Sequence, residues 1–309
     1  MELIRGLANL KSRHSGCALT IGNFDGVHLG HQALLDQARE IAQSLGLPSA
    51  VMSFDPTPRE YFARDEAPPR VATLRDKLAQ IQDRGIDRLL LVRFCRHFAS
   101  QSPQAFVEEL LIRRLGVRAL VVGDDFRFGR ERAGNLELLG KLGTEHGMIV
   151  ETLGPVDVDG LRCSSTAVRG ALGAADLAAA AKLLGRPYSI RGVVRHGRKL
   201  GRTLGVPTAN IAFKQRMALR YGVYAVRVQQ ANRQWTGVAN FGVRPTLGGD
   251  QRLLLEVHAF ADTGDLYGRQ LRVEFSRFLR PEQRFDSLDA LKTQIRLDAD
   301  AARDHFSIA

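Results

Sequence analysis

Apolar runs without polar alternation limit what the first half of this 309-residue chain can fold into. In Ala119-Leu120-Val121-Val122 no polar residue interrupts the run, which is typical of a parallel strand that helices cover on both faces. Longer amphipathic segments separate these runs, so strands and helices are expected to alternate. We expect strands near residues 17–22, 49–54, 88–93, 118–123 and 148–153. The pattern predicts a doubly wound parallel sheet.

The pattern changes near Gly185, after an Ala-rich helical stretch. Polar and apolar residues then alternate, which predicts antiparallel strands, and a small barrel would remove their exposed edges. We expect strands at 222–228, 235–242, 253–260 and 270–278, then a helix from Ser287 to about Phe306. The predicted fold class is α/β plus β, with a doubly wound domain over 1–186 and an antiparallel barrel with a C-terminal helix over 187–309.

Composition is that of an ordinary globular protein, but its charge is uneven. The formal net charge is +11, and residues 187–309 hold 20 basic and 11 acidic side chains, which suits polyanions such as ATP. The basic residues are scattered over alternating strands, so nucleic acid is not the expected partner. Cys17, Cys95 and Cys163 lack metal-binding or CxxC spacing, which fits reduced thiols. Without a signal-peptide pattern or an apolar stretch of about 20 residues, we expect a cytoplasmic enzyme that does not bind membranes.

A glycine-rich loop, Gly22-Asn-Phe-Asp-Gly-Val-His-Leu-Gly-His31, lies between an apolar strand and a helical pattern that starts at Gln32. The beginning of a helix favours anions, and glycines let a phosphate approach the backbone. His28 and His31 can both aim ring N–H groups at the same phosphates and stabilise the charge that grows during nucleotidyl transfer. A zinc site is disfavoured because no third ligand lies nearby, whereas ordinary surface histidines are the alternative.

The HxGH element formed by His28 to His31 is the mark of a nucleotidyltransferase superfamily, and the longer loop resembles that of bacterial bifunctional riboflavin kinase/FAD synthetases. The resemblance implies FMN adenylyltransferase activity in the first half and riboflavin kinase activity in the second. ATP would be the co-substrate, Mg²⁺ the cofactor, and riboflavin, FMN and FAD the substrates and products. The loop residues implied in ATP binding are Gly22, Asn23, Phe24, Asp25 and Gly30.

The segment Ser164-Ser-Thr-Ala-Val-Arg169 supports this resemblance. By itself it is weak evidence, because any helix can begin with such residues. Beside HxGH it resembles the family's SSTxxR element, in which hydroxyl groups and the arginine fork hold ATP phosphates. The resemblance therefore implies an ATP-binding role for Ser164, Ser165 and Thr166, and a catalytic role for Arg169.

Two stretches that follow expected strands, Phe54–Glu60 and Gly123–Gly129, resemble flavin-contacting segments of the same family. Ligands bind beyond the carboxyl ends of strands in open α/β sheets, and aromatic side chains can wall an isoalloxazine ring. The family often carries His where this chain has Thr57. The alternative is that the phenylalanines belong to the core. The implied flavin contacts are Phe54, Pro56, Pro58, Asp125, Phe126 and Phe128.

The second half carries a basic glycine-rich stretch, Gly197–Gly205, followed by Pro207-Thr-Ala-Asn210. Its spacing is not that of a Walker A loop, and alone it reads as a basic turn. It resembles the riboflavin kinase signature, as do 238–246, 255–258, 265–268 and 280–285. The resemblance implies that Gly201 contacts ATP and that Thr208 and Asn210 bind ATP and Mg²⁺.

The same resemblance implies that Glu256 is the general base that activates the ribityl 5′-hydroxyl, and it suggests flavin contacts from Arg284 and Phe285. A structural ion pair of an inward-facing Glu256 is the alternative. Two other functions also remain open. One is an HxGH adenylyltransferase for a different substrate, such as a phosphopantetheine-like or nicotinate nucleotide, with an accessory barrel. The other is a basic nucleic-acid-binding module without turnover.

Overall fold

The computed structural model describes residues 1–196, 207–245 and 251–307. The chain forms two compact units, one made of 1–68 and 77–164 and the other of 69–76 and 165–307. The chain therefore passes between the units three times. The predicted boundary after residue 186 concerns functional domains and stays a prediction. No helix among the described residues is long and apolar enough to cross a bilayer.

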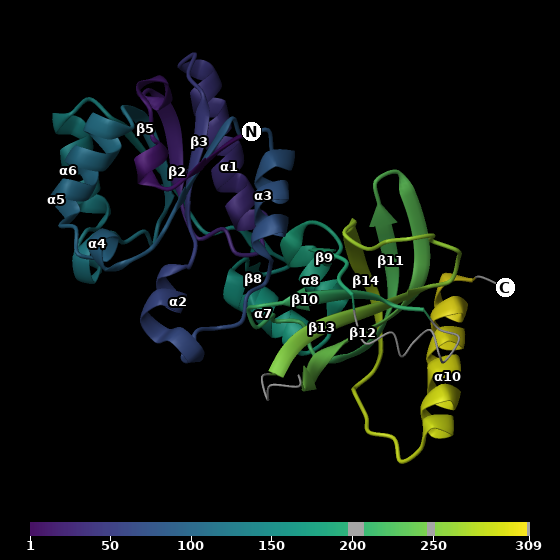
Figure 1. Ribbon diagram of the computed structural model, residues 1–309. Helices are drawn as coiled ribbons and strands as arrows, with labels where there is room; N and C mark the ends of the chain where they lie inside the picture. The colour runs from purple at the N-terminus through teal and green to yellow at the C-terminus, as the bar shows by residue number, and fades with distance from the viewer. Residues whose placement is uncertain (197–206, 246–250, 308–309) are drawn as a thin grey trace. The chain divides into compact units, whose positions relative to one another are not determined.

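The first unit contains a parallel six-stranded sheet in the order β1-β4-β3-β2-β5-β6 (Figure 1). Five strands lie within one residue of the predicted positions. The four-residue edge strand β1 was not predicted, because it is too short to show a pattern. The strands are β1 (Glu2–Arg5), β2 (Cys17–Ile21), β3 (Ser49–Phe54), β4 (Arg88–Val92), β5 (Val117–Gly123) and β6 (Ile149–Leu153).

Helices lie on both sides of this sheet, with α1 and α3 on one side and α6 on the other (Figure 1). The resulting core includes the fully buried Leu19, Met52 and Leu120, as expected for strands covered on both faces. The helices are α1 (Leu29–Ser44), α2 (Pro58–Ala63), α3 (Leu74–Asp83), α4 (Arg96–Ala99), α5 (Pro103–Ala105), the π-helical η4 (Phe106–Arg114) and α6 (Leu136–Glu145). Short elements are η1 (Leu7–Asn9), η2 (Ser12–His14), η3 (Arg64–Glu66), η5 (Arg130–Arg132), β7 (Asp157–Val158) and β8 (Leu161–Arg162).

The second unit contains α7 (Ser165–Gly173), α8 (Leu177–Leu184) and an antiparallel sheet in the order β10-β13-β12-β11-β14-β9. Arg195, two residues after β9, forms a bridge with Asn210 of β10, so the sheet is nearly a closed barrel. The four predicted strands correspond to β11–β14, whereas β9 and β10 were not predicted. The strands are β9 (Ser189–Val193), β10 (Ala209–Phe213), β11 (Gly222–Gln230), β12 (Arg233–Pro245), β13 (Gln251–Ala259) and β14 (Gln270–Arg280).

The predicted C-terminal helix is α10 (Leu288–Phe306), which runs beside the barrel (Figure 1). Ser287 caps it by accepting a hydrogen bond from Ala290 N at 3.1 Å. Ala299 and Ala302 pack on Val223 and Ala225. Small residues on the buried face let the helix lie close to the strands.

The segment 69–76 crosses into the second unit and is held there by backbone and side-chain hydrogen bonds. Arg70 N donates to Arg216 O and Ala218 N donates to Arg70 O, both at 2.8 Å. Tyr188 Oη donates to Val71 O at 2.9 Å. Because these partners are distant in sequence, no local pattern could have predicted the segment's position.

Candidate functional site

The HxGH loop begins where β2 ends, and its first glycine stays attached to the neighbouring strand. Gly22 N donates to Met52 O at 3.1 Å. The loop then turns through two non-glycine residues with positive φ, Phe24 at 48° and Val27 at 41°. Both are almost fully buried, so side-chain packing holds the backbone in a conformation that L-residues adopt rarely. Of the residues implied to contact ATP, Phe24 has a buried side chain, so only its backbone could take part. Asn23 is exposed.

His28 is the N-cap of α1, and His31 lies one turn into the helix. The two imidazole rings stack with centroids 3.6 Å apart. His31 N lies 3.4 Å from His28 Nδ1 and donates to it, and Cys163 Sγ is 3.8 Å from the same nitrogen. When Nδ1 accepts a hydrogen bond, a neutral imidazole carries its proton on Nε2. The cap thus leaves His28 with an Nε2–H donor at the beginning of the helix.

Gly30 lies close to the His28 ring. A Cβ at this position would lie 3.3 Å from the His28 ring and 3.4 Å from Cys163 O, so a larger residue would require His28 to shift by a few tenths of an ångström. The glycine of HxGH therefore provides room for the histidine that precedes it. The structure confirms that the loop leads directly into a helix, which begins at Leu29, earlier than the predicted Gln32.

The SSTxxR element crosses the division between the compact units, since Ser164 ends the first and Ser165 begins α7 in the second. Ser164 and Ser165 are half-buried and Thr166 is exposed. Arg169 is half-buried, and its Nε donates to Pro69 O at 2.8 Å. This bond ties the guanidinium to the segment 69–76, and an ATP-binding role for these four residues stays a prediction.

The implied flavin residues differ in their burial. Phe54 and Phe128 are buried in the core of the first unit, whereas Phe126 is half-buried and stacks on Phe128 at 5.6 Å. Asp125 is exposed. Thr57, at the position where His is common in the family, instead forms a capping box with Glu60 that starts α2. Pro56 and Pro58 flank this cap and are half-buried.

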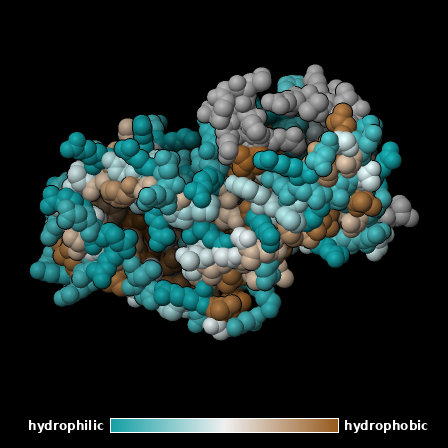
Figure 2. Space-filling view, turned by 90° about the horizontal axis from the view of Figure 1, so that it is seen from below, coloured by the Kyte–Doolittle hydropathy of each residue, from teal (hydrophilic) through white to brown (hydrophobic). Residues whose placement is uncertain are grey.

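An aromatic cluster that sequence reasoning missed surrounds Phe54. Phe94 packs edge-on against Phe54 at 5.8 Å, and Tyr61 and Phe62 pack against Phe94 at 5.5 and 5.7 Å. Phe62 is 70% exposed, which is unusual for a phenylalanine without a partner surface. In the part of Figure 2 that the first unit occupies, apolar side chains line a hollow surrounded by hydrophilic ones. This unit therefore has an apolar depression on its surface and an exposed aromatic edge.

In the second unit, three polar residues form a row across neighbouring barrel strands. Glu256 on β13 is opposite Asn210 on β10 and opposite Asn240 on β12. Directly opposed residues point to the same face of a sheet with Cβ atoms about 5 Å apart. The buried Leu255 and Val257 alternate with Glu256, so Glu256 lies on the face away from the barrel core, not inward.

Asn240 was not among the predicted site residues. The segment containing it was recognised, but the register that places it beside Glu256 is a tertiary property. Its Nδ2 donates to Glu282 Oε1 at 3.3 Å. Asn210 Nδ2 donates to Thr208 O at 3.2 Å, which fixes the amide with Oδ1 as its acceptor atom. The row therefore presents oxygen atoms of an amide and a carboxylate side by side.

The structure shows fewer contacts for the remaining predicted kinase residues. Thr208 is half-buried immediately before β10, and Gly201 lies outside the described residues. Arg284 is exposed and Phe285 is half-buried, with Arg280 Cζ 5.8 Å from the Phe285 ring centroid. Their flavin contacts stay predictions. The described residues hold no group of three or more His, Cys, Asp or Glu arranged to bind a metal.

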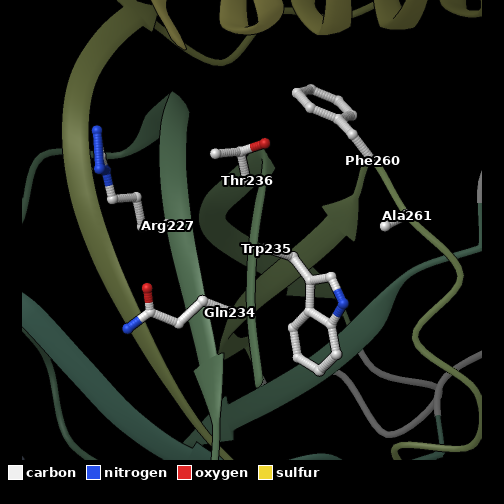
Figure 3. A pocket seen from close by; sticks show the side chains of 6 residues that line it. All are labelled: Arg227, Gln234, Trp235, Thr236, Phe260 and Ala261. Atoms are coloured by element: carbon white, nitrogen blue, oxygen red, sulfur yellow. The ribbon is translucent and has the colours of Figure 1, made fainter. Parts of the chain in front are cut away.

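A pocket of about 350 Å³ opens elsewhere on the second unit, and none of its residues belongs to the predicted sites. Figure 3 shows side chains from β11, from β12 and from the two residues that follow β13 around it. Arg227 Cζ lies 5.1 Å from the Phe306 ring centroid and Arg303 Cζ lies 4.6 Å from that of Phe260, so α10 stabilises this region by cation–π contacts. The lining residues are Arg227, Gln234, Trp235, Thr236, Phe260 and Ala261.

Family models match both halves of the chain, that of FAD synthetase over residues 10–167 and that of riboflavin kinase over 184–306. The bifunctional riboflavin kinase/FMN adenylyltransferase of Pseudomonas fluorescens is 51% identical over 98% of this chain and 97% of its own. The Escherichia coli protein of the same name is 48% identical over 100% of this chain and 99% of its own. A crystal structure of a macrolide-efflux protein from Streptococcus pneumoniae has a TM-score of 0.81 and 29% identity, over 98% of this chain and 99% of that one.

The matches to relatives span both the parallel sheet with its HxGH loop and the barrel with the Glu256 row. The relatedness thus reaches beyond isolated motifs. The alternatives of a different HxGH adenylyltransferase or a binding module do not account for a riboflavin kinase match over 184–306. The chain belongs to the family of bifunctional riboflavin kinase/FMN adenylyltransferases.

Proposed function

We propose that this chain phosphorylates riboflavin to FMN with one ATP and then joins FMN to the AMP part of a second ATP, releasing pyrophosphate. Residues 187–309 carry the first step and residues 1–186 the second. The observation that carries the proposal is that each half supplies its own polar constellation, the stacked His28–His31 pair at the start of α1 and the Asn210–Glu256–Asn240 row.

In adenylyl transfer, a phosphate oxygen of FMN attacks the α-phosphorus of ATP, and the bond to pyrophosphate breaks. Negative charge grows on the α-phosphoryl and leaving oxygens. His28 Nε2–H donates to this charge, because its Nδ1 is engaged by His31 N. The first amides of α1 add a fixed positive potential. Arg169, Ser164, Ser165 and Thr166 hold the remaining phosphates.

In the kinase step, the ribityl 5′-oxygen attacks the γ-phosphorus of ATP, and ADP leaves. Glu256 accepts the proton from that hydroxyl group. Its place on the non-core face of β13 keeps the carboxylate accessible to a substrate, which an inward-facing side chain would not be. Asn240, opposite Glu256, orients the carboxylate or the hydroxyl group, a role that the sequence did not suggest.

Magnesium fits the residues of the kinase site. The donor set is Thr208 and the Oδ1 of Asn210, hard oxygen ligands of the kind this cation prefers. When bound, the ion would neutralise charge on the ATP phosphates. Thr208 and Asn210 would hold it. We further propose that the partners are ATP, riboflavin and FMN, with no nucleic acid or membrane, and that the enzyme acts in the cytoplasm.

The test is a chromatographic time course of flavin products from purified full-length protein with ATP and Mg²⁺, starting in parallel from riboflavin and from FMN. We expect FMN to appear before FAD in the first reaction, and FAD alone in the second. If riboflavin is not consumed while FMN becomes FAD, the kinase assignment is wrong. If folded protein forms no flavin product at all, both assignments are wrong.

A further inference from the structure

Lys77 is a buried cation at the end of the parallel sheet where the HxGH loop begins. It lies in α3 and is 3% exposed. Its Nζ donates to Ser53 Oγ at 3.2 Å and to Phe54 O at 3.4 Å. Both acceptors belong to the last two residues of β3, the strand next to β2. The ammonium group therefore sits at the carboxyl edge of the central strands, where ligands bind in sheets of this kind.

Ser53 extends this contact to the HxGH loop itself. Its side chain is fully buried, and Oγ donates to Asn23 O at 3.2 Å. A continuous chain of hydrogen bonds thus runs from Lys77 through Ser53 to the backbone of the second loop residue. Asn23 is exposed, so its side chain lies at the surface while its backbone carbonyl is anchored from the buried side.

The anchor lies at the residue where the loop conformation is hardest to maintain. Phe24, immediately after Asn23, has a φ of 48° and a completely buried ring that packs 5.1 Å from His31. Such a backbone persists only where its surroundings over-determine it. Here the hydrogen bond to the Asn23 carbonyl and the packing of the Phe24 ring hold the backbone from two sides. Releasing the carbonyl would allow the Asn23–Phe24 peptide to rotate and would change the direction of its N–H group.

Burying an ammonium group is costly, whereas an apolar side chain of similar length would satisfy packing alone. Packing alone therefore does not explain why a positive charge is buried beneath this phosphate-binding loop. The charge strengthens the hydrogen bond that Lys77 donates to Ser53, which in turn becomes a better donor to Asn23 O. It also contributes a favourable potential to the polyphosphate on the other side of the loop.

We propose that Lys77 is a positioning residue for adenylyl transfer. Through Ser53 it holds the Asn23–Phe24 peptide in the orientation that binds ATP phosphates, and its charge favours the anionic transition state. This inference rests on the proposed function, because it assigns Lys77 to the FMN adenylyltransferase step and to no other. No sequence motif identified Lys77, since its link to the loop passes through residues 24 and 54 positions away.

The experiment compares full-length wild type with Lys77→Met, Ser53→Ala and the double variant. FMN adenylylation and riboflavin phosphorylation are measured separately on each protein, with thermal unfolding as the check on folding. Lys141→Met, at an exposed site on α6, is the matched control. We expect Lys77→Met to lower kcat for FAD formation about tenfold, with the KM for FMN changed less than about twofold. Kinase activity should remain within about twofold of wild type.

The double variant shows whether Lys77 and Ser53 act through the same chain of hydrogen bonds or independently of each other. If Lys77 acts through Ser53, the loss in the double variant should be clearly smaller than the product of the two single losses. Equal loss of both activities, a kcat for FAD formation within about twofold of wild type in folded Lys77→Met, or multiplicative losses would each overturn the proposal. If the wild type itself makes no FAD from FMN, the proposed function fails first.

Discussion

Asn210 on β10 lies directly opposite Glu256 on β13, and Asn240 lies opposite the same glutamate from the other side. Two amides thus flank Glu256, the proposed general base, on the face away from the barrel core. Glu256→Gln should retain the shape of the row but remove the proton acceptor, so riboflavin phosphorylation should fall at least about 10²-fold. FMN adenylylation by the same protein should be unchanged. Product chromatography from each flavin would measure both, and a kinase loss below about threefold would contradict the role of Glu256.

His28 has a structural role and a proposed chemical role, which substitutions can separate. It caps α1, and its Nε2–H is the proposed donor to the α-phosphoryl group. His28→Ala should lower FAD formation by about 10² to 10³-fold and destabilise the fold by about 1 kcal/mol. His28→Asn keeps a cap acceptor, so it should retain stability but not activity. His146→Ala, at an exposed histidine after α6, is the control. Retained activity in His28→Asn would assign His28 to the cap alone.

Titration of Asp76 should make the free energy of unfolding depend on pH in a predictable direction. Burial raises the pKa of this carboxyl group, although Thr73 Oγ1 at 2.6 Å and Arg191 N at 3.1 Å donate to it. Its proton is therefore held more tightly in the folded than in the unfolded chain, whose carboxyl pKa is about 3.9. The Asp76 contribution to the free energy of unfolding should fall as pH rises from about 4 through the raised pKa, because the folded state binds more protons there.

The check on Asp76 is urea unfolding of wild type and Asp76→Asn across the acidic range. The difference in the free energy of unfolding should shift in favour of the variant as pH rises, because only the wild type must then bury a charge. Asp83→Asn, on the same helix and exposed, should leave the pH profile unchanged. A difference that does not vary with pH, or that shifts toward the wild type, would show that Asp76 does not titrate as its burial requires.

The three cysteines should differ in reactivity. Burial raises the pKa of the Cys17 thiol to about 11, whereas Cys95 is only half-buried. Alkylation requires the thiolate, so iodoacetamide at about pH 8 should label Cys95 well before Cys17 in the folded protein. Peptide mass spectrometry of timed samples measures the order, with urea-denatured protein as the control in which all three react. Early labelling of Cys17 would mean that β2 opens under native conditions.

Much of the architecture could be predicted because it depends on local patterns. Unbroken apolar runs located five parallel strands, and alternation located β11–β14. Short or irregular elements escaped prediction. β1 has four residues, and β9 and β10 derive their strand character from partners far along the chain, such as the pairing of Gly192 with Leu271. The segment 69–76 joined the second unit through contacts with residues more than 100 positions away, which no local pattern contains.

The sequence by itself determined which chemical groups the protein could use, because motifs such as HxGH and PTAN fix residue types at fixed spacing along one element. On this basis it predicted roles for His28, His31 and Asn210, and the family resemblance added Glu256. Only the tertiary structure decided how those groups are oriented and supported. The cap that directs the His28 proton to Nε2, the face on which Glu256 lies, and the path from Lys77 to Asn23 depend on strand register and on packing between distant segments. The spacing of a motif describes residues that are close in sequence, whereas these hydrogen bonds and this burial involve residues that only the folded chain brings together.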